Sequence, residues 1–370
     1  MSPSPVTAVT PAAPATPRAP HWLQQRFGLA LPVLQAPMAG SQDHRLAVAV
    51  ARAGGLGALA GAMFSPEALA AEITAFRQAV DAPLNVNFFC HQPPDPTQPD
   101  VAAALDRWEA TLAPHAQRLG LNPQALPRGA GRMPFSADVA AVLEQHRPEV
   151  VSFHFGLPAP ELLARVKATG AVVLSSATTV DEARWLVQHG ADAVIAQGLE
   201  AGGHRGHFLS HDLSLQCGLL ALLPQVVQAV GVPVIAAGGI TTPQAVAAAQ
   251  ALGASAVQVG TAFLVTPEAT TAPLHRAALA QASHRPTALT NLFTGRPARG
   301  LVNRVMAELG PLSADAPPFP LATAAMTALR TESERQGLDD HTPLWAGQAA
   351  ALAVAQPAAE VARQLAAAWL

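Results

Sequence analysis

Short apolar runs alternate repeatedly with helical segments along most of this chain, and this alternation limits the folds that it can adopt. Eight runs rich in Val, Ile, Ala and Leu recur, at 31–36, 56–60, 84–90, 150–155, 172–175, 193–196, 234–237 and 256–259. Their residues are mostly apolar, without a regular alternation of polar and apolar residues in most runs, so we expect each strand to be covered on both faces, as in parallel sheets. About eight β-α units is the number that closes a barrel. The sequence therefore predicts an α/β fold, a TIM (β/α)8 barrel, with a doubly wound sheet as second choice.

The segments outside this alternation divide the chain into further parts. Residues 1–20 hold six prolines among Ala, Ser and Thr, which predicts a flexible tail and not a signal peptide. We expect the barrel to occupy 21–262, with an insertion at about 91–149 that begins at the proline-rich stretch 93–96. Beyond it we expect a smaller helical cap domain at 263–330. A C-terminal helical segment, 331–370, is expected to pack back on the barrel.

Composition excludes several classes of protein. Half of the 370 residues are apolar, 13% are charged and the net charge is −3, so a large core is expected and no nucleic-acid partner. No apolar run reaches the roughly 20 residues of a membrane span, so no membrane partner is expected. The two cysteines, Cys90 and Cys217, lack a C-x-x-C spacing, which fits a reducing, cytoplasmic compartment. The chain has no tyrosine, which removes one candidate catalytic acid.

A glycine-rich loop after the sixth apolar run is the first candidate for chemistry. Residues 196–206 contain Gly202, Gly203 and Gly206 around one histidine, His204. Glycine lets the main chain approach a flat or anionic ligand closely, and an imidazole beside that ligand can transfer a proton near neutral pH. The alternative is a tight turn with an exposed histidine. His154, at the end of the fourth run, is expected to face the same volume; its alternative is a hydrogen-bonded core histidine.

Other unusual residues follow the remaining strands. In a barrel the loops after the strand ends carry the chemistry, and glycines after strands seven and eight commonly bind phosphate through backbone N–H groups. Gly238-Gly239 and Gly260-Thr261 occupy those positions, unless they are ordinary tight turns. Buried amides such as Asn87 and Gln197 need hydrogen-bond partners, which a heterocycle edge supplies. With the apolar Pro37-Met38 shelf after the first strand, these features describe a pocket for flavin mononucleotide (FMN).

Three further patterns are less informative. Gly55 to Ala60 formally matches a dinucleotide fingerprint, but it follows a helix and leads into a strand, so we interpret it as a tight turn. His204, His207 and His211 have no recognised ligand spacing, so no metal site is expected. Arg205 is expected to form a salt bridge with Glu200 and hold the loop.

Taken together and in order, the motifs resemble the nitronate monooxygenase family, in particular its class I members. The segments that carry the resemblance are 36–40, 85–89, Ser152-Phe153-His154-Phe155-Gly156 within 151–156, 197–206, 237–240, 258–261 and Gly295-Arg296-Pro297-Ala298-Arg299 within 294–299. The resemblance implies non-covalently bound FMN, with His204 as the active-site histidine and His154 as a second pocket histidine. The residues expected to bind the cofactor are Ala36, Pro37, Met38, Asn87, Ser176, Gln197, Gly202, Gly203, Gly238, Gly239, Gln258, Gly260 and Thr261.

The activity that the resemblance implies is oxidation of alkyl nitronates, such as propionate 3-nitronate, and of some neutral nitroalkanes. O2 is the co-substrate, and a carbonyl compound and nitrite are the products, which implies a role in detoxification by a monomer or homodimer. The main alternative is an NAD(P)H-dependent FMN reductase acting on quinones or enoyl thioesters on the same barrel. A phosphosugar isomerase or lyase without flavin also stays open, as does a non-catalytic flavin-binding protein.

Overall fold

Eight parallel strands close into a barrel, as predicted. The computed structural model describes residues 21–95, 97–129 and 132–369, so the expected tail at 1–20 lies outside the described residues. The strands follow each other around the barrel in the order β1-β9-β8-β6-β5-β4-β3-β2, and a parallel bridge between Leu34 and Leu56 joins the two ends. They are β1 (Val33–Gln35), β2 (Gly57–Leu59), β3 (Leu84–Phe89), β4 (Val150–His154), β5 (Val172–Ala177), β6 (Ala193–Gln197), β8 (Val234–Ala237) and β9 (Ala256–Val259).

Helices surround the barrel and bury the outer face of its strands. They are α2 (His44–Arg52), α3 (Pro66–Ala79), α5 (Ala137–His146), α6 (Pro160–Ala168), α7 (Val180–Gln188), α8 (Leu219–Ala229), α9 (Pro243–Ala251), α10 (Thr261–Leu264) and α14 (Ala358–Ala366). Ser65, Ser136, Thr179 and Thr242 each accept a backbone hydrogen bond from the residue three positions on, which fixes the starts of α3, α5, α7 and α9. Short 3-10 turns lie at Gly61–Met63, Pro123–Ala125, Leu213–Leu215 and Ala350–Leu352.

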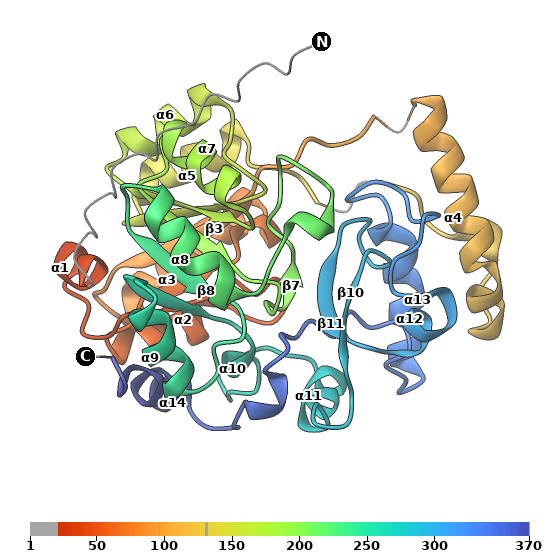
Figure 1. The fold of residues 1–370 in the computed structure, drawn as a ribbon. Helices are drawn as coiled ribbons and strands as arrows, with labels where there is room; N and C mark the ends of the chain where they lie inside the picture. The colour runs from red at the N-terminus through yellow and green to blue at the C-terminus, as the bar shows by residue number, and fades with distance from the viewer. Residues whose placement is uncertain (1–20, 96, 130–131, 370) are drawn as a thin grey trace, which may run out of the picture.

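One end of the barrel is closed by apolar packing. Helix α1 (Trp22–Phe27) places Leu23 in a fully buried cluster with the interior residues Leu34, Leu56, Val150 and Ile235. Figure 1 shows α1 on the side of the barrel away from β10 and β11. Asn85 of β3, which lies opposite Val150 in the strand register, is a buried polar residue at this level, whereas Asn87, His154, Gln197 and Gln258 line the cavity at the opposite end.

The turn into β2 gives the glycines at 55 and 57 a packing role. A Cβ at Gly57 would collide with the backbone carbonyl of Ala47, and one at Gly55 would lie 2.8 Å from the Val33 oxygen. Both glycines are thus required by the close approach of α2 to the sheet.

A second, smaller body covers the other end of the barrel (Figure 1). It contains α11 (Pro273–Ala280), α12 (Arg304–Leu309) and α13 (Thr323–Arg335), together with an antiparallel sheet of β10 (Thr287–Thr290), β11 (Ala298–Leu301) and β7 (Gly203–His204). This body thus contains a small antiparallel sheet besides the expected helices. Strands β10 and β11 are four residues long and contain Thr, Arg and Gly, so they have no apolar run from which a strand could be predicted.

The segment at about 91–149 divides between the two bodies. Helix α4 (Pro99–Arg118) packs Trp108, Leu112 and Ala116 against residues of α12 and α13, and Figure 1 shows it on the far side of the second body. Helix α5 instead contacts α3 and α6 and is an ordinary barrel helix. Chain segments distant in sequence therefore meet in the second body.

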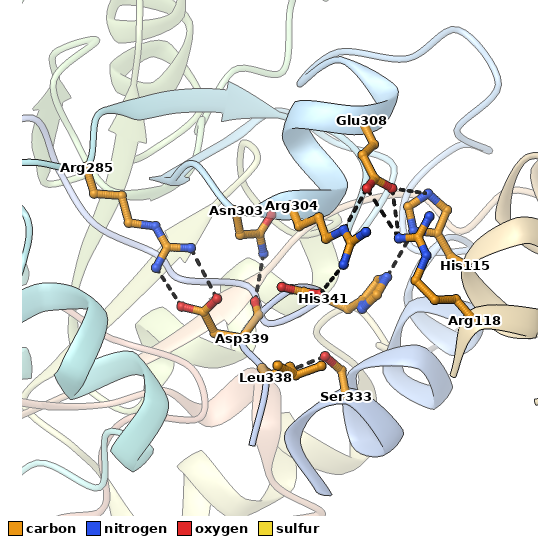
Figure 2. A network of polar contacts seen from close by, with 11 residues as sticks. His115, Arg118, Arg285, Asn303, Arg304, Glu308, Ser333, Leu338, Asp339 and His341 are labelled. Carbon is orange, nitrogen blue, oxygen red and sulfur yellow. Dashed lines mark hydrogen bonds and ion pairs between the residues drawn. The ribbon is translucent and has the colours of Figure 1, made fainter. Parts of the chain in front are cut away.

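A polar network fastens α4 to this body (Figure 2). Nδ1 of the buried His115 lies 3.1 Å from Nε2 of His341, and its Nε2 lies 3.6 Å from a carboxylate oxygen of Glu308. Arg118 and Arg304 bind the same carboxylate at 3.0 and 2.6 Å. Burial lowers the pKa of His341 to about 4, so the histidine pair is uncharged at neutral pH.

The last helix returns to the barrel. Ala358, Val361, Ala362 and Leu365 of α14 are buried in the same cluster as residues of α2 and α9. No helix within the described residues is long and apolar enough to cross a membrane.

Candidate functional site

A cavity lies at the ends of the barrel strands beneath the second body. Every site residue expected from the sequence lines it. They are Ala36, Pro37, Met38, Asn87, His154, Ser176, Gln197, Gly202, Gly203, His204, Gly238, Gly239, Gln258, Gly260 and Thr261. Residues from most of the barrel strands and from the glycine loop thus converge on one volume, because parallel strands present their carboxyl ends at the same face.

The glycine loop is held from both sides. As strand β7 it pairs with β11, with His204 opposite Ala298, so the second body fixes the backbone of the histidine. Arg205 is fully buried beneath the loop and donates to the carbonyls of Gly198 at 2.7 Å and Gln197 at 2.8 Å, and to the Gln216 side chain. The loop is therefore a rigid part of the site.

The expected salt bridge between Arg205 and Glu200 is wrong. The Glu200 carboxylate instead accepts from the backbone N–H of Leu219 at 2.9 Å, at the start of α8. The N-terminus of a helix offers unpaired N–H groups, which attract the Glu200 carboxylate. The nearby Arg205 guanidinium is already hydrogen-bonded to carbonyl oxygens and does not bind this carboxylate.

His204 is held in one tautomer. Its Nε2 lies 3.0 Å from the hydroxyl oxygen of Thr294, and that hydroxyl in turn donates to the carbonyl of Arg296 at 3.3 Å. Because the threonine proton is used in that bond, we assign the imidazole proton of His204 to Nε2, as the donor, and the lone pair to Nδ1. Within the described residues Nδ1 has no hydrogen-bond partner. Burial, and then the positive charge of Arg132, hold the pKa of His204 well below 6.5, so the ring is a neutral base.

His154 and Gln197 both bind the backbone of that histidine. Nε2 of His154 donates to the carbonyl of His204 at 3.1 Å, and the Gln197 amide nitrogen donates to it at 3.0 Å. The Gln197 amide oxygen accepts from Gly206 N–H at 2.8 Å. Burial lowers the pKa of His154 to about 3. The geometry therefore gives both residues a positioning contact, with both ends of the Gln197 amide already engaged in the loop.

The shelf after β1 rests on a buried glutamine pair. Gln42 accepts from the backbone N–H of Met38 at 2.8 Å and from the Gln35 side chain at 2.9 Å, and both glutamines donate to the carbonyl of Ala58. This pair was not anticipated from the sequence, although a glutamine within an apolar strand was a usable signal.

The β8 and β9 side of the cavity offers unpaired donors. Gly238 and Gly239 have φ of 114° and 71°, in the left-handed region that favours glycine. In the described part of the chain, the backbone N–H groups of Gly239, Ile240 and Gly260 have no acceptor. The amide oxygen of Gln258 is likewise buried without a partner. Such groups fit an anionic group at this end and a hydrogen-bonding ligand beside it.

Several lining residues are not among the site residues expected from the sequence. Ala39, Phe89, Ala201, Ala237 and Ile240 belong to segments that carry the family resemblance. Outside those segments are Ser41, Arg132, Ile195, Thr241, Leu264, His275, Trp345, Gly347 and Ala349. Thr294 lay within a segment quoted for the family resemblance, but its contact with His204 was not foreseen. Among the described residues, no group of three or more His, Cys, Asp or Glu side chains is arranged to hold a metal ion.

Comparison with known proteins identifies close relatives. The family model described as nitronate monooxygenase matches residues 21–368. A nitronate monooxygenase of Paraburkholderia phytofirmans is 41% identical over 92% of both chains, and one of Pseudomonas aeruginosa is 41% identical over 92% of this chain and 96% of that protein.

Two solved structures are similar to this chain over almost its whole length. A nitroalkane oxidase from Streptomyces ansochromogenes superposes with a TM-score of 0.84 at 40% identity, covering 93% of this chain and 96% of that one. FabK from Thermotoga maritima superposes with a TM-score of 0.70 at 27% identity, covering 93% and 94%.

Proposed function

This chain belongs to the nitronate monooxygenase family, a family of flavin-dependent oxidoreductases, and on that premise we propose that it binds FMN and oxidises alkyl nitronates with O2. The products are a carbonyl compound and nitrite, and propionate 3-nitronate is a suitable test substrate. The observation that carries the proposal is the neutral His204, which lines the cavity and has an unpaired Nδ1. The opposite side of the same cavity offers free backbone N–H groups that can bind an anion.

The residues present fit FMN. The unpaired N–H groups of Gly239, Ile240 and Gly260 suit its phosphate, and the orphaned oxygen of Gln258 suits a ring N–H. Asn87 and the Pro37-Met38 shelf supply further polar and apolar lining. When bound, the flavin supplies the electron acceptor for nitronate oxidation and the site of reaction with O2.

His204 acts on the substrate proton. With a neutral nitroalkane, Nδ1 removes the proton from the carbon that bears the nitro group, and the bonding electrons pass to the nitro oxygens, giving the nitronate. The imidazolium formed attracts that anion, while Thr294 keeps the ring in place. With a nitronate already formed, no proton transfer is required.

The aromatic residues around the histidine exclude water. The ring centres of Phe89, Phe319 and Trp345 lie 5.9, 5.5 and 5.7 Å from that of His204. Low exposure to water strengthens every electrostatic contact made inside the cavity. The second body therefore completes the site.

The likeness to FabK keeps an NAD(P)H-dependent enoyl reductase as the second candidate. An anaerobic titration of the purified protein separates the two, with flavin absorbance followed during addition of propionate 3-nitronate and, in a second sample, of NADH. Loss of oxidised-flavin absorbance with the nitronate alone supports the proposal. Rapid bleaching by NADH with no response to the nitronate favours the reductase, and a protein purified without flavin contradicts both. Mass analysis of the released flavin tests the assignment to FMN.

A further inference from the structure

Arg132 is an unexplained cation in the cavity wall. The residue is partly buried and lines the cavity, and within the described residues its guanidinium makes no hydrogen bond or ion pair. Its Cζ atom lies 5.8 Å from the centre of the Phe89 ring. None of the described residues that line the cavity is an aspartate or glutamate. The arginine therefore has no fixed counter-charge in the site.

Such a group is costly unless an anion reaches it. Removing a charge from water is unfavourable without a partner, and burial accordingly lowers the pKa of Arg132. A guanidinium nevertheless stays charged near neutral pH and binds carboxylates with two parallel hydrogen bonds. A ligand with an anionic group would thus supply the counter-charge that the described lining of the cavity does not provide.

The phosphate of the cofactor is not the anion that would bind Arg132. The free N–H groups suited to it follow β8 and β9, whereas Phe89, which Arg132 contacts, ends β3. In the barrel, β3 is separated from β8 by three strands on each side. Arg132 therefore lies across the cavity from the phosphate end.

The arginine lies instead beside the catalytic histidine. Phe89 contacts both groups, with its ring centre 5.9 Å from that of His204, and the charge of Arg132 is a main cause of the lowered pKa of that histidine. A substrate whose nitronate lies at His204 can thus direct a second group toward Arg132 along the face of Phe89.

We propose that Arg132 is a specificity-determining residue that binds a carboxylate at the far end of the substrate. The enzyme then prefers short nitronates that carry a carboxylate over alkyl nitronates of equal length. This inference rests on the proposed function.

The test compares two nitronates with three carbons, propionate 3-nitronate and propyl 1-nitronate. In Arg132→Met we expect kcat/KM for the carboxylated substrate to fall about 10- to 100-fold, the effect of one charged hydrogen-bonded pair. The value for propyl 1-nitronate changes by less than about twofold on the same reasoning. Arg132→Lys restores part of the loss, because it keeps the charge without the bidentate geometry.

Arg128→Met is the matched control. Arg128 is an exposed arginine of the same segment, paired with Asp106 at 2.8 Å and with Glu109, and it does not line the cavity. We expect no change with either substrate. Equal losses on both substrates in Arg132→Met, or no loss on either, overturn the inference.

Binding keeps this inference separable from the proposed function. If the wild-type protein oxidises neither nitronate, the proposed function fails. Calorimetry then still decides on Arg132: tighter binding of 3-nitropropionate than of 1-nitropropane, lost in Arg132→Met, supports the carboxylate site. Equal affinity for the two nitro compounds overturns it.

Discussion

The hydroxyl oxygen of Thr294 lies 3.0 Å from Nε2 of His204, and this contact decides which nitrogen of the histidine can act as a base. The two residues are distant in sequence, yet β11, which follows Thr294, pairs with the strand that contains His204. The second body therefore does more than cover the cavity: it sets the tautomer of the histidine that we propose as the base.

Replacing Thr294 by valine tests this relationship. The isosteric side chain removes the acceptor, so the ring loses its preferred tautomer and orientation. We expect kcat on a neutral nitroalkane to fall about tenfold, with a smaller effect on the preformed nitronate. Thr294→Ser keeps the hydroxyl and should retain most of the activity. If valine and serine behave alike, the hydroxyl has no orienting role.

Replacing His204 by asparagine tests proton abstraction directly. The variant lacks a base of suitable pKa, so turnover of a neutral nitroalkane should fall about 10²- to 10⁴-fold while FMN is retained. The loss on the preformed nitronate should be smaller, because that substrate needs no proton removed. Steady-state kinetics on both forms of one nitro compound provide the comparison, and equal losses would rule out the base.

The buried histidines should make the protein less stable in acid. Burial lowers the pKa of His275 to about 4, against 6.5 for the free side chain. The unfolded chain therefore binds a proton below pH 6.5 that the folded chain refuses until about pH 4. The contribution of His275 is complete above pH 6.5 and falls as the pH drops, by about 2 kcal/mol at pH 5.

Urea unfolding at pH 7 and pH 5 measures this effect. The free energy of unfolding should decrease at pH 5, and in His275→Gln the decrease should be smaller by about 2 kcal/mol, since one titrating group is gone. The same pH dependence in both proteins would show that His275 is not neutral in the folded state.

Much of the barrel was readable from the sequence because its strands are continuous runs of Val, Ile, Ala and Leu bounded by turns. The residues at their ends, from Met38 to Thr261, could be assigned to one face for the same reason. Strand β7, in contrast, consists of Gly203 and His204 alone and forms only because β11 pairs with it. Periodicity within one segment cannot predict such a pairing.

Cavity residues outside the barrel repeat could not be predicted from the sequence for a related reason. Arg132 follows a Gly- and Pro-rich stretch with no helical or strand pattern, and Trp345 precedes the last helix by a loop. Each reaches the cavity only through packing between distant segments. Their roles follow from geometry and charge, which the linear sequence does not contain.

The close approach of Gly202 to the segment after Trp345 gives the last prediction. A Cβ at position 202 would lie 2.6 Å from the Ala346 carbonyl carbon and from the Gly347 nitrogen, both backbone atoms that cannot move aside alone. Gly347 in turn donates to Thr261 Oγ1 at 3.0 Å, beside the expected phosphate site. In Gly202→Ala the strain should therefore pass to that site, and we expect FMN occupancy, measured as the ratio of flavin to protein absorbance, to fall. Gly231→Ala is the control, because a Cβ there has nothing within 4 Å and the residue lies outside the cavity. Full occupancy in Gly202→Ala would mean that the 345–349 segment does not constrain the cofactor.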